Sequence, residues 1–133
     1  MTPKLLAIRF FAVLLAFLSS APRADDSVIF SKDIQPILNE RCVVCHVRGA
    51  EQGNLALDRR NALANLVAQP SSQSGLARVE PGDSTESYLI HKLKGNQLEV
   101  GGSGARMPLG SGPLTKKEIA KFESWINEGA AGN

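Results

Sequence analysis

The spacing of apolar residues along the chain predicts four helices separated by polar loops. A short extended stretch is expected immediately before the second helix. Asp33 is the expected N-cap of the first helix, because Pro36 then occupies the third helical position, where its missing N–H is not needed. The first three helices are expected over residues 33–42, 59–68 and 84–94, and the last lies between Thr115 and Gly129.

The last helix has the clearest start and stop signals in the sequence. Thr115 and Glu118 have the spacing of a capping box, and Gly129 lies where a C-terminal cap is expected. Leu114 and Ile119 have the spacing of a hydrophobic staple. We expect the apolar face of this helix to cross the apolar face of the first helix and to close the core. The two faces consist of Ile119, Phe122, Trp125 and Ile126 and of Ile34, Ile37 and Leu38.

Residues 95–113, between the third and fourth helices, have no periodic apolar pattern and are expected to form a long loop. Six of the 12 glycines fall in this stretch. Loops of this length in compact domains are usually functional or disordered. Met107, which lies between Arg106 and Pro108, is the residue expected to tie the loop down.

The sequence Cys42-Val43-Val44-Cys45-His46 follows the first predicted helix. Two cysteines at this spacing, followed at once by histidine, are what covalent attachment of a c-type haem requires. One helical turn separates the sulfurs, so both can reach one porphyrin edge, and His46 can then bind the iron as the proximal ligand. The alternatives are a thioredoxin-like dithiol, which belongs in a βαβ pattern, and a zinc site, which needs more clustered Cys or His than this chain offers.

The N-terminal residues have the pattern of a secretory signal peptide. Basic residues precede an apolar run over residues 10–18, and small residues follow it. We expect residues 1–24 to be removed, with cleavage after Ala21 as the alternative, which leaves residues 25–133 as one exported, periplasmic domain. An uncleaved anchor is the weaker alternative, because the apolar run is far shorter than the roughly 20 residues that a membrane span needs.

Removal of the leader changes the charge and the aromatic content of the chain. The leader contains three of the 15 Lys and Arg residues, so 12 basic residues remain against 13 acidic ones. A near-neutral chain without a basic tract gives no basis for nucleic-acid binding. Both cysteines lie in the haem motif, so none is left for a disulfide. The aromatic core is thin, so we expect the haem to supply part of the core and the apoprotein to fold poorly. The remaining aromatic residues are Phe30, Tyr88, Phe122 and Trp125.

A series of short motifs runs through residues 30–131 in a fixed order. The motifs are Phe30, Asp33-Ile34, Pro36-Ile37-Leu38, Cys42-Val43-Val44-Cys45-His46, Gly53-Asn54-Leu55-Ala56-Leu57-Asp58, Val79-Glu80-Pro81-Gly82, Ser87-Tyr88-Leu89, Arg106-Met107-Pro108, Leu114, Trp125-Ile126 and Gly129-Ala130. This series resembles the planctomycete-type cytochrome c domain and, more broadly, the class I monohaem cytochromes c.

The resemblance implies an all-α, cytochrome c-like fold of about four helices around one covalently bound haem c. It also implies that His46 is the proximal iron ligand and Met107 the distal one. The chain departs from the pattern in two ways. No proline lies between His46 and Pro70, although many such cytochromes use a proline carbonyl to orient the proximal imidazole, so that acceptor is unassigned. Members of the family are often modules inside larger enzymes, whereas this chain has little sequence after its last helix.

The residues themselves also favour Met107 as the distal ligand. It is the methionine that remains after the leader is removed, and it lies on the loop that can reach back to the iron. The alternative for Met107 is a core-filling role. His91 is the competing ligand, but its place in a predicted helix suits an ordinary, partly exposed histidine. Arg106, next to Met107, is the expected partner of a haem propionate.

These assignments predict an electron carrier rather than an enzyme. An iron held by His46 and Met107 has no open position, so its chemistry is the transfer of one electron, and a thioether ligand raises its potential. We expect a periplasmic monomer that exchanges electrons with redox protein partners through a small docking patch. The alternatives are a haem subunit of a dehydrogenase complex and, if the distal site is open, a protein that binds a gas or peroxide.

Overall fold

The structure, a computed structural model, describes residues 27–48 and 52–133. The predicted signal peptide at residues 1–24 therefore lies outside the described residues. Within the part of the chain that is described, no helix has the length and apolar character needed to cross a membrane.

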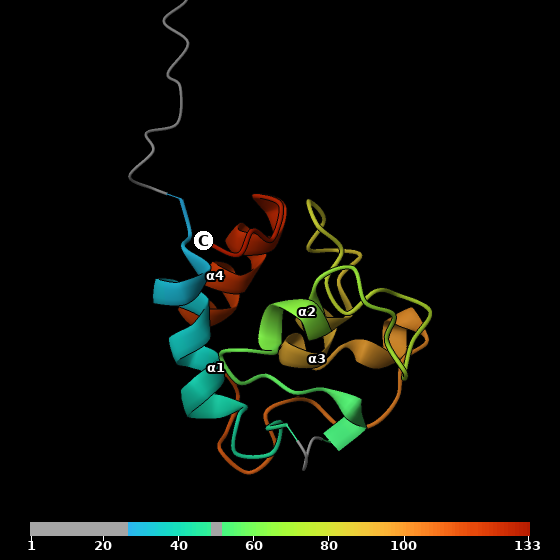
Figure 1. Cartoon of the computed structure of the whole chain (residues 1–133). Helices are drawn as coiled ribbons and strands as arrows, with labels where there is room; N and C mark the ends of the chain where they lie inside the picture. Colours follow the sequence, from blue (N-terminus) through green and yellow to red (C-terminus); the bar gives the residue numbers. More distant parts are fainter. Residues whose placement is uncertain (1–26, 49–51) are drawn as a thin grey trace, which may run out of the picture.

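The described residues form a small all-α fold, which confirms the predicted fold class. They contain four α-helices and isolated β-bridges, and no strand occurs among them. In Figure 1 the long C-terminal helix lies beside the helical segment that opens the described chain. The α-helices are α1 (Gln35–Arg41), α2 (Ala62–Leu66), α3 (Tyr88–Lys94) and α4 (Lys116–Asn127). Three shorter turns are the π-helical η1 (Phe30–Ile34) and the 3-10 turns η2 (Gln52–Asn54) and η3 (Gln97–Val100).

The first helical segment begins earlier than predicted, and the assignment of Asp33 as its N-cap is wrong. The segment starts with η1, whose N-cap is Ile29. Asp33 lies inside η1, and its Oδ2 accepts a hydrogen bond of 3.1 Å from the N–H of Ile29. Its Oδ1 lies 3.1 Å from Nζ of Lys121 on α4. The carboxylate thus binds the start of the segment and ties it to α4, while Pro36 lies in the first turn of α1.

We expect Asp33→Ala to destabilise the protein by about 1 kcal/mol, the usual cost of losing a side chain that binds a helix start. The N–H of Ile29 and, after it, Lys121 hold the pKa of Asp33 below its usual value. A lowered pKa in the folded state means that this stabilisation is present above the ordinary Asp pKa of about 4 and is lost as the pH falls below it. Urea unfolding at neutral pH and near pH 3 measures both effects. Glu40→Ala, at an exposed position on α1, is the control, and an equal loss for both variants would contradict the prediction.

The second and third helices are shorter than predicted because their ends take part in other backbone pairing. Val67 leaves α2 in an extended conformation and forms a bridge with Val79. The first amides of α3, those of Tyr88 and Leu89, donate to the carbonyls of Ala77 and Arg78 (both 2.9 Å). A turn over residues 84–87 therefore precedes α3, and the Asp83 carboxylate accepts its free amides.

The last helix confirms its predicted signals. The Thr115 side chain accepts from the Glu118 N–H, and the Glu118 carboxylate accepts from the Thr115 N–H, which completes the capping box. Leu114 and Ile119 are both buried in the core, as the staple requires. Gly129 has a φ of 101°, in the left-handed region that favours glycine, and its N–H donates to Ile126 O.

The core forms where α4 packs against the N-terminal helical segment. The predicted face of α4 is buried, and it contacts η1. The rings of Phe30 and Trp125 lie 5.1 Å apart, centroid to centroid, at an interplanar angle of 45°. Ile34 and Leu38 are buried as predicted, whereas Ile37 is only partly buried at the edge of the core. The predicted crossing is thus confirmed, with Phe30 as an additional member.

Candidate functional site

The Cys42–His46 motif forms a tight turn directly after α1. Cys42 is the C-cap of α1, and its carbonyl accepts from the N–H groups of Cys45 (3.1 Å) and His46 (3.0 Å). This winding gathers both cysteines and the histidine into one turn, as the sequence predicted. Both cysteines are free thiols, with Cys42 partly buried and Cys45 exposed. Burial raises the pKa of Cys42 to about 11, so its thiol is protonated at neutral pH.

The His46 ring is fixed by a backbone carbonyl in the segment that follows the motif. Its Nδ1 lies 3.0 Å from Leu55 O. Because a carbonyl can only accept, Nδ1 carries the proton and donates it, and in the neutral ring the lone pair is then on Nε2. This is the arrangement that metal-binding histidines use. Leu55 thus supplies the acceptor that the sequence left unassigned when no proline followed the motif.

The backbone holds the same two segments together around this contact. The N–H of Leu57 donates to His46 O at 2.6 Å, and the N–H of Gln52 donates to Cys45 O at 3.2 Å. The segment after the motif therefore folds back along it, and Leu55 O is held facing the imidazole. The residues between, 49–51, lie outside the described part of the chain.

The predicted loop over residues 95–113 contains η3 and has more anchors than the single one expected. Gln97 is buried, and its Nε2 donates to Gly104 O at 2.7 Å. Lys92 is also buried, and its Nζ donates to Ser103 O at 3.0 Å. The first half of the loop is thereby tied to α3 and η3 before the chain reaches Met107.

The second half of the loop is bonded to α3 at Met107 and, further along, to Arg41 next to the motif. The Met107 N–H donates to Lys92 O at 2.9 Å. Further on, Nη2 of Arg41, the residue before Cys42, donates to Ser111 O (3.0 Å) and Gly112 O (2.9 Å). Met107 itself is partly buried. These contacts bring the Met107 loop against the helix end that carries the motif, as Figure 1 shows for the orange loop and the turn after α1.

Arg106 has a structural contact that the sequence did not predict. Its Nε donates to Leu93 O at 2.9 Å, and its aliphatic stem lies over Gly95, where a Cβ would come within 2.8 Å of the Arg106 Cδ. Gly95 also ends α3 with a φ of 83°. Arg106 therefore holds the C-terminus of α3 and the start of the Met107 loop, and its pairing with a haem propionate stays a prediction.

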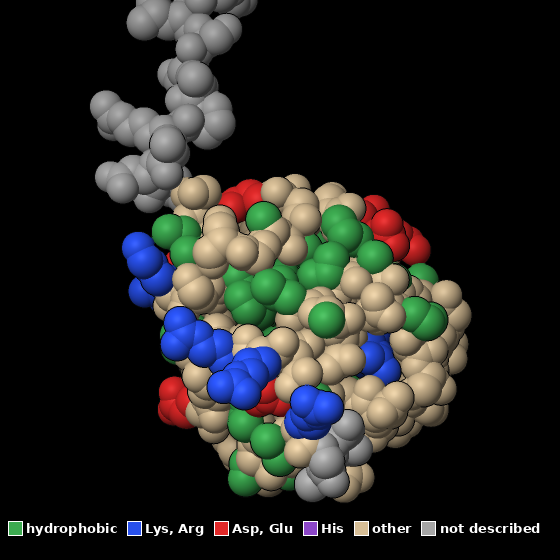
Figure 2. Space-filling view, viewed as in Figure 1, with side chains coloured by type: hydrophobic (Ala, Val, Ile, Leu, Met, Phe, Trp, Pro, Cys, Tyr) green, Lys and Arg blue, Asp and Glu red, His purple; other side chains and the backbone are tan. Residues whose placement is uncertain are grey.

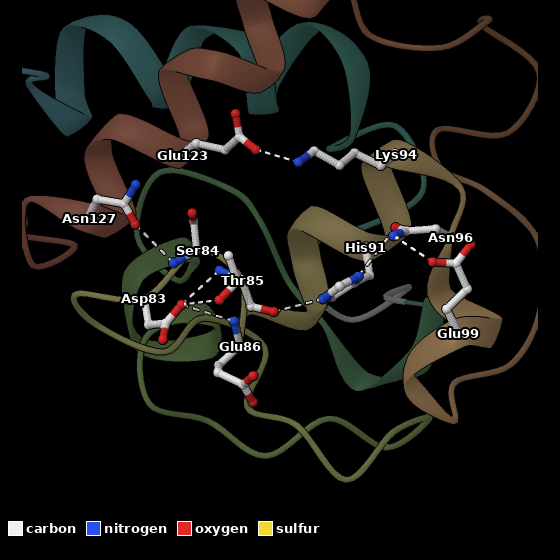
Figure 3. A network of polar contacts seen from close by, with 10 residues as sticks. All are labelled: Asp83, Ser84, Thr85, Glu86, His91, Lys94, Asn96, Glu99, Glu123 and Asn127. Carbon is white, nitrogen blue, oxygen red and sulfur yellow. Dashed lines mark hydrogen bonds and ion pairs between the residues drawn. The ribbon is translucent and has the colours of Figure 1, made fainter.

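His91 is engaged through both ring nitrogens. Its Nε2 lies 2.8 Å from Thr85 O and its Nδ1 lies 3.2 Å from Oδ1 of Asn96, as Figure 3 shows. Asn96 Nδ2 in turn donates to Glu99 at 3.3 Å. These contacts fasten α3 to the turn before it and to η3, which is the role of an ordinary structural histidine. Neither nitrogen is left open for an iron in this arrangement.

The surface near the motif contains exposed apolar side chains. Val44, between the two cysteines, is 83% exposed, and Leu109, two residues after Met107, is 65% exposed. Figure 2 shows Lys and Arg side chains gathered over α1 and toward the lower edge of that face, with apolar side chains grouped beside them. The motif and the Met107 loop thus both present apolar groups to the solvent.

The residues present fit a covalently attached haem in their chemistry. Two free thiols lie in one turn with an imidazole whose Nε2 has no hydrogen-bond partner in the described part of the chain, and a partly buried thioether lies on a loop tied to the same helix end. Two residues that the sequence did not identify bind the carbonyls on either side of Leu55: Arg78 Nη2 donates to Asn54 O at 3.3 Å, and Asn65 Nδ2 donates to Ala56 O at 3.0 Å. An isolated arginine or asparagine gives no periodic or spacing signal.

Comparisons with known proteins bear on the fold. No protein-family model matches the chain, and no curated protein sequence matches it. Among solved structures, the chain is similar to one titled Kuenenia stuttgartiensis hydrazine synthase, with a TM-score of 0.50 and 23% sequence identity. The similarity covers 77% of this chain but only 16% of that one, so the chain spans a small part of the length of the protein it matches. At this level of identity the similarity shows a shared fold.

Proposed function

We propose that this protein is an exported monohaem c-type cytochrome that carries single electrons between redox proteins. The observation that carries the proposal is the His46 ring: its Nδ1–H is bound by Leu55 O, and its Nε2, which has no partner among residues 27–48 and 52–133, lies in the same turn as two free thiols. The motif resemblance to planctomycete-type cytochrome c domains supports the same assignment. In this proposal Cys42 and Cys45 form the thioethers.

The chain's own residues then account for a closed, one-electron site. Bound haem supplies a one-electron couple. His46 binds the iron through Nε2, and Leu55 O keeps its ring in one tautomer and orientation. Met107 is the proposed distal ligand, supplied by a loop that Lys92 and Arg41 tether at both ends. His46 and Met107 together would leave a bound iron without a position for substrate, so the chemistry that the haem would supply is electron transfer.

The exposed apolar residues beside the site suit a transient redox partner. Val44 and Leu109 are both more than half exposed. Weak electron-transfer encounters use small interfaces, often below about 1,200 Å² in total. We therefore propose that partners dock over the motif and the Met107 loop, and that the protein acts as a monomer between encounters.

A second candidate is a haem subunit or module in a larger oxidoreductase. The structural similarity to a short part of a much longer hydrazine synthase chain favours it, because the same helical fold occurs there as one portion of a larger protein. Size-exclusion chromatography of the exported protein separates the two candidates: a carrier elutes as a monomer, whereas a subunit elutes with other polypeptides.

The proposal is tested by the mass and spectra of the native protein from its host. We expect the mass of residues 25–133 plus one haem, and haem that stays with the protein through acid–acetone extraction. The absorption bands should change between the oxidised and reduced states, and the reduced protein should bind little carbon monoxide. Haem that extracts freely, or a zinc ion in its place, would refute the proposal.

A further inference from the structure

The segment that presents Leu55 O to His46 has an unusual backbone. Gly53 and Asn54 have φ values of 65° and 52°, so two successive residues lie in the left-handed region. That region is open to glycine but costs energy for a residue with a Cβ, although Asn tolerates it better than most. Such a conformation persists where surrounding groups hold it. The groups that hold it therefore also set the position of the Leu55 carbonyl.

Arg78 binds the carbonyls of these two residues from a distant part of the chain. Its Nη2 donates to Asn54 O (3.3 Å) and, more weakly, to Gly53 O (3.5 Å). Its Nη1 donates to Asn65 O at 2.8 Å, next to the end of α2. The planar guanidinium can serve three carbonyls at once because its N–H groups diverge in a fixed fork. A lysine ammonium has the charge but not the fork.

The backbone of Arg78 is itself fixed on both sides. Its N–H donates to Gln69 O at 2.7 Å, and its carbonyl accepts from the Leu89 N–H at 2.9 Å. The residue thus lies between the exit of α2 and the first turn of α3. A guanidinium that starts from a fixed backbone position and ends on three carbonyls has little freedom to move.

The Asn65 side chain binds the carbonyl of the residue after Leu55. Its Nδ2 donates to Ala56 O at 3.0 Å. The carbonyls immediately before and after Leu55 are therefore both bound by side chains, through Arg78 and Asn65. The Leu55 carbonyl between them is left to accept from His46 Nδ1.

In this position the guanidinium of Arg78 is partly removed from water. It is partly buried, and burial lowers its pKa from the usual arginine value. In the described part of the chain its side chain donates to backbone carbonyls. Removing a charged group from water is unfavourable unless its hydrogen bonds are replaced. Three carbonyls supply that replacement: those of Gly53 and Asn54 precede Leu55, and that of Asn65 lies on α2.

We propose that Arg78 is the positioning residue for the proximal imidazole: its guanidinium fixes the Gly53–Leu57 segment so that Leu55 O binds Nδ1–H of His46. The inference rests on the proposed function, in which His46 binds iron. A bound Nδ1–H makes the imidazole a more basic ligand and favours the oxidised iron. Arg78 thereby controls ring orientation and reduction potential without touching the haem ligands.

Arg78→Lys in the haem-loaded protein tests the role of the fork with the charge retained. We expect the His46 Nδ1 proton, followed by NMR, to exchange with solvent about tenfold faster than in the wild type. We also expect the reduction equilibrium to shift about threefold toward the reduced form, a rise of about 28 mV for a one-electron couple. Arg60→Lys, the same substitution at an exposed arginine, is the matched control and should change neither quantity.

Arg78→Gln separates positioning from charge. If Arg78 acted only as a positive charge, Lys would preserve the potential and Gln would lower it, since a nearby cation favours the reduced iron. Positioning instead predicts faster Nδ1–H exchange in both variants. Asn65→Ala, which removes one amide and keeps Arg78, should accelerate exchange in the same direction by a smaller factor. It serves as the second variant if either Arg78 variant fails to fold.

The outcomes distinguish this inference from the proposed function. Wild-type protein without covalent haem would refute the proposed function and, with it, this inference. Normal covalent haem together with unchanged exchange and potential in Arg78→Lys, or in Asn65→Ala where the Arg78 variants do not fold, would overturn the positioning role alone. A drop in potential confined to Arg78→Gln would assign Arg78 a purely electrostatic role and would also overturn it.

Discussion

Met107→Ala is expected to turn a closed iron site into one that binds carbon monoxide. The variant removes the thioether but keeps the backbone N–H that donates to Lys92 O and the Arg41 contacts to the same loop. The fold should therefore survive while the distal ligand is lost. We expect loss of the weak red absorption band of a sulfur–iron bond, nearly complete carbon monoxide binding in the reduced state, and a potential lower by more than about 59 mV, or tenfold in the reduction equilibrium.

His91→Ala is the matched control for this experiment. Its ring is held by Thr85 O and the Asn96 side chain, so its removal should affect the stability of the turn before α3 and leave the iron spectra unchanged. Wild-type protein that already binds carbon monoxide fully, or a His91 variant that opens the iron, would show that Met107 is not the distal ligand. In the first case the electron-carrier proposal would give way to a gas- or peroxide-binding protein, and in the second His91 would close the site in place of Met107.

The parts of the fold that sequence predicted well depend on local signals. The capping box of Thr115 and Glu118 involves groups three residues apart, and Gly129 is required by the backbone conformation at its own position. Neither depends on distant parts of the chain. The apolar face of α4 is similarly local, and its burial against η1 followed from the need to cover it.

The parts that sequence mispredicted depend on pairing with distant residues. The start of α3 moved to Tyr88 because its first amides bind the carbonyls of Ala77 and Arg78. The position of Pro36 predicts Asp33 as an N-cap, but the Asp33 carboxylate instead reaches back to Ile29 and across to Lys121. Helical periodicity does not report a π-helical turn or a bridge formed by an irregular segment.

The candidate site likewise contains one part that local sequence signals predicted and one part that depends on distant residues. Cys42, Cys45 and His46 are adjacent in sequence, and their spacing alone predicted a common turn. The acceptor for His46 lies nine residues further on, and its position depends on the left-handed conformations of Gly53 and Asn54. No spacing rule identifies Leu55, because the contact belongs to a carbonyl that any residue possesses.

Replacing both Cys42 and Cys45 with alanine is expected to abolish covalent haem and to destabilise the fold. The four aromatic side chains of the domain are all buried, with Phe30 and Trp125 in contact, so the core contains little further aromatic surface. A ligand bound only by the folded state stabilises it, by about 4 kcal/mol when present at 1,000 times its Kd. We therefore expect the double variant to lose at least about 4 kcal/mol in urea unfolding, and any haem that His46 and Met107 still bind to be removed by acid–acetone.

Val44→Ala is the control for the double variant, because Val44 lies in the same turn and is 83% exposed. It should keep covalent haem and lose less than about 0.5 kcal/mol, as exposed substitutions usually do. Cys42 is partly buried, so its replacement removes some packing as well as a thioether; the single variants Cys42→Ala and Cys45→Ala separate the two effects, since Cys45 is exposed. A double variant that unfolds at the same urea concentration as the wild type would show that the helices form a sufficient core by themselves. The covalent haem would then contribute nothing measurable to the stability of the fold.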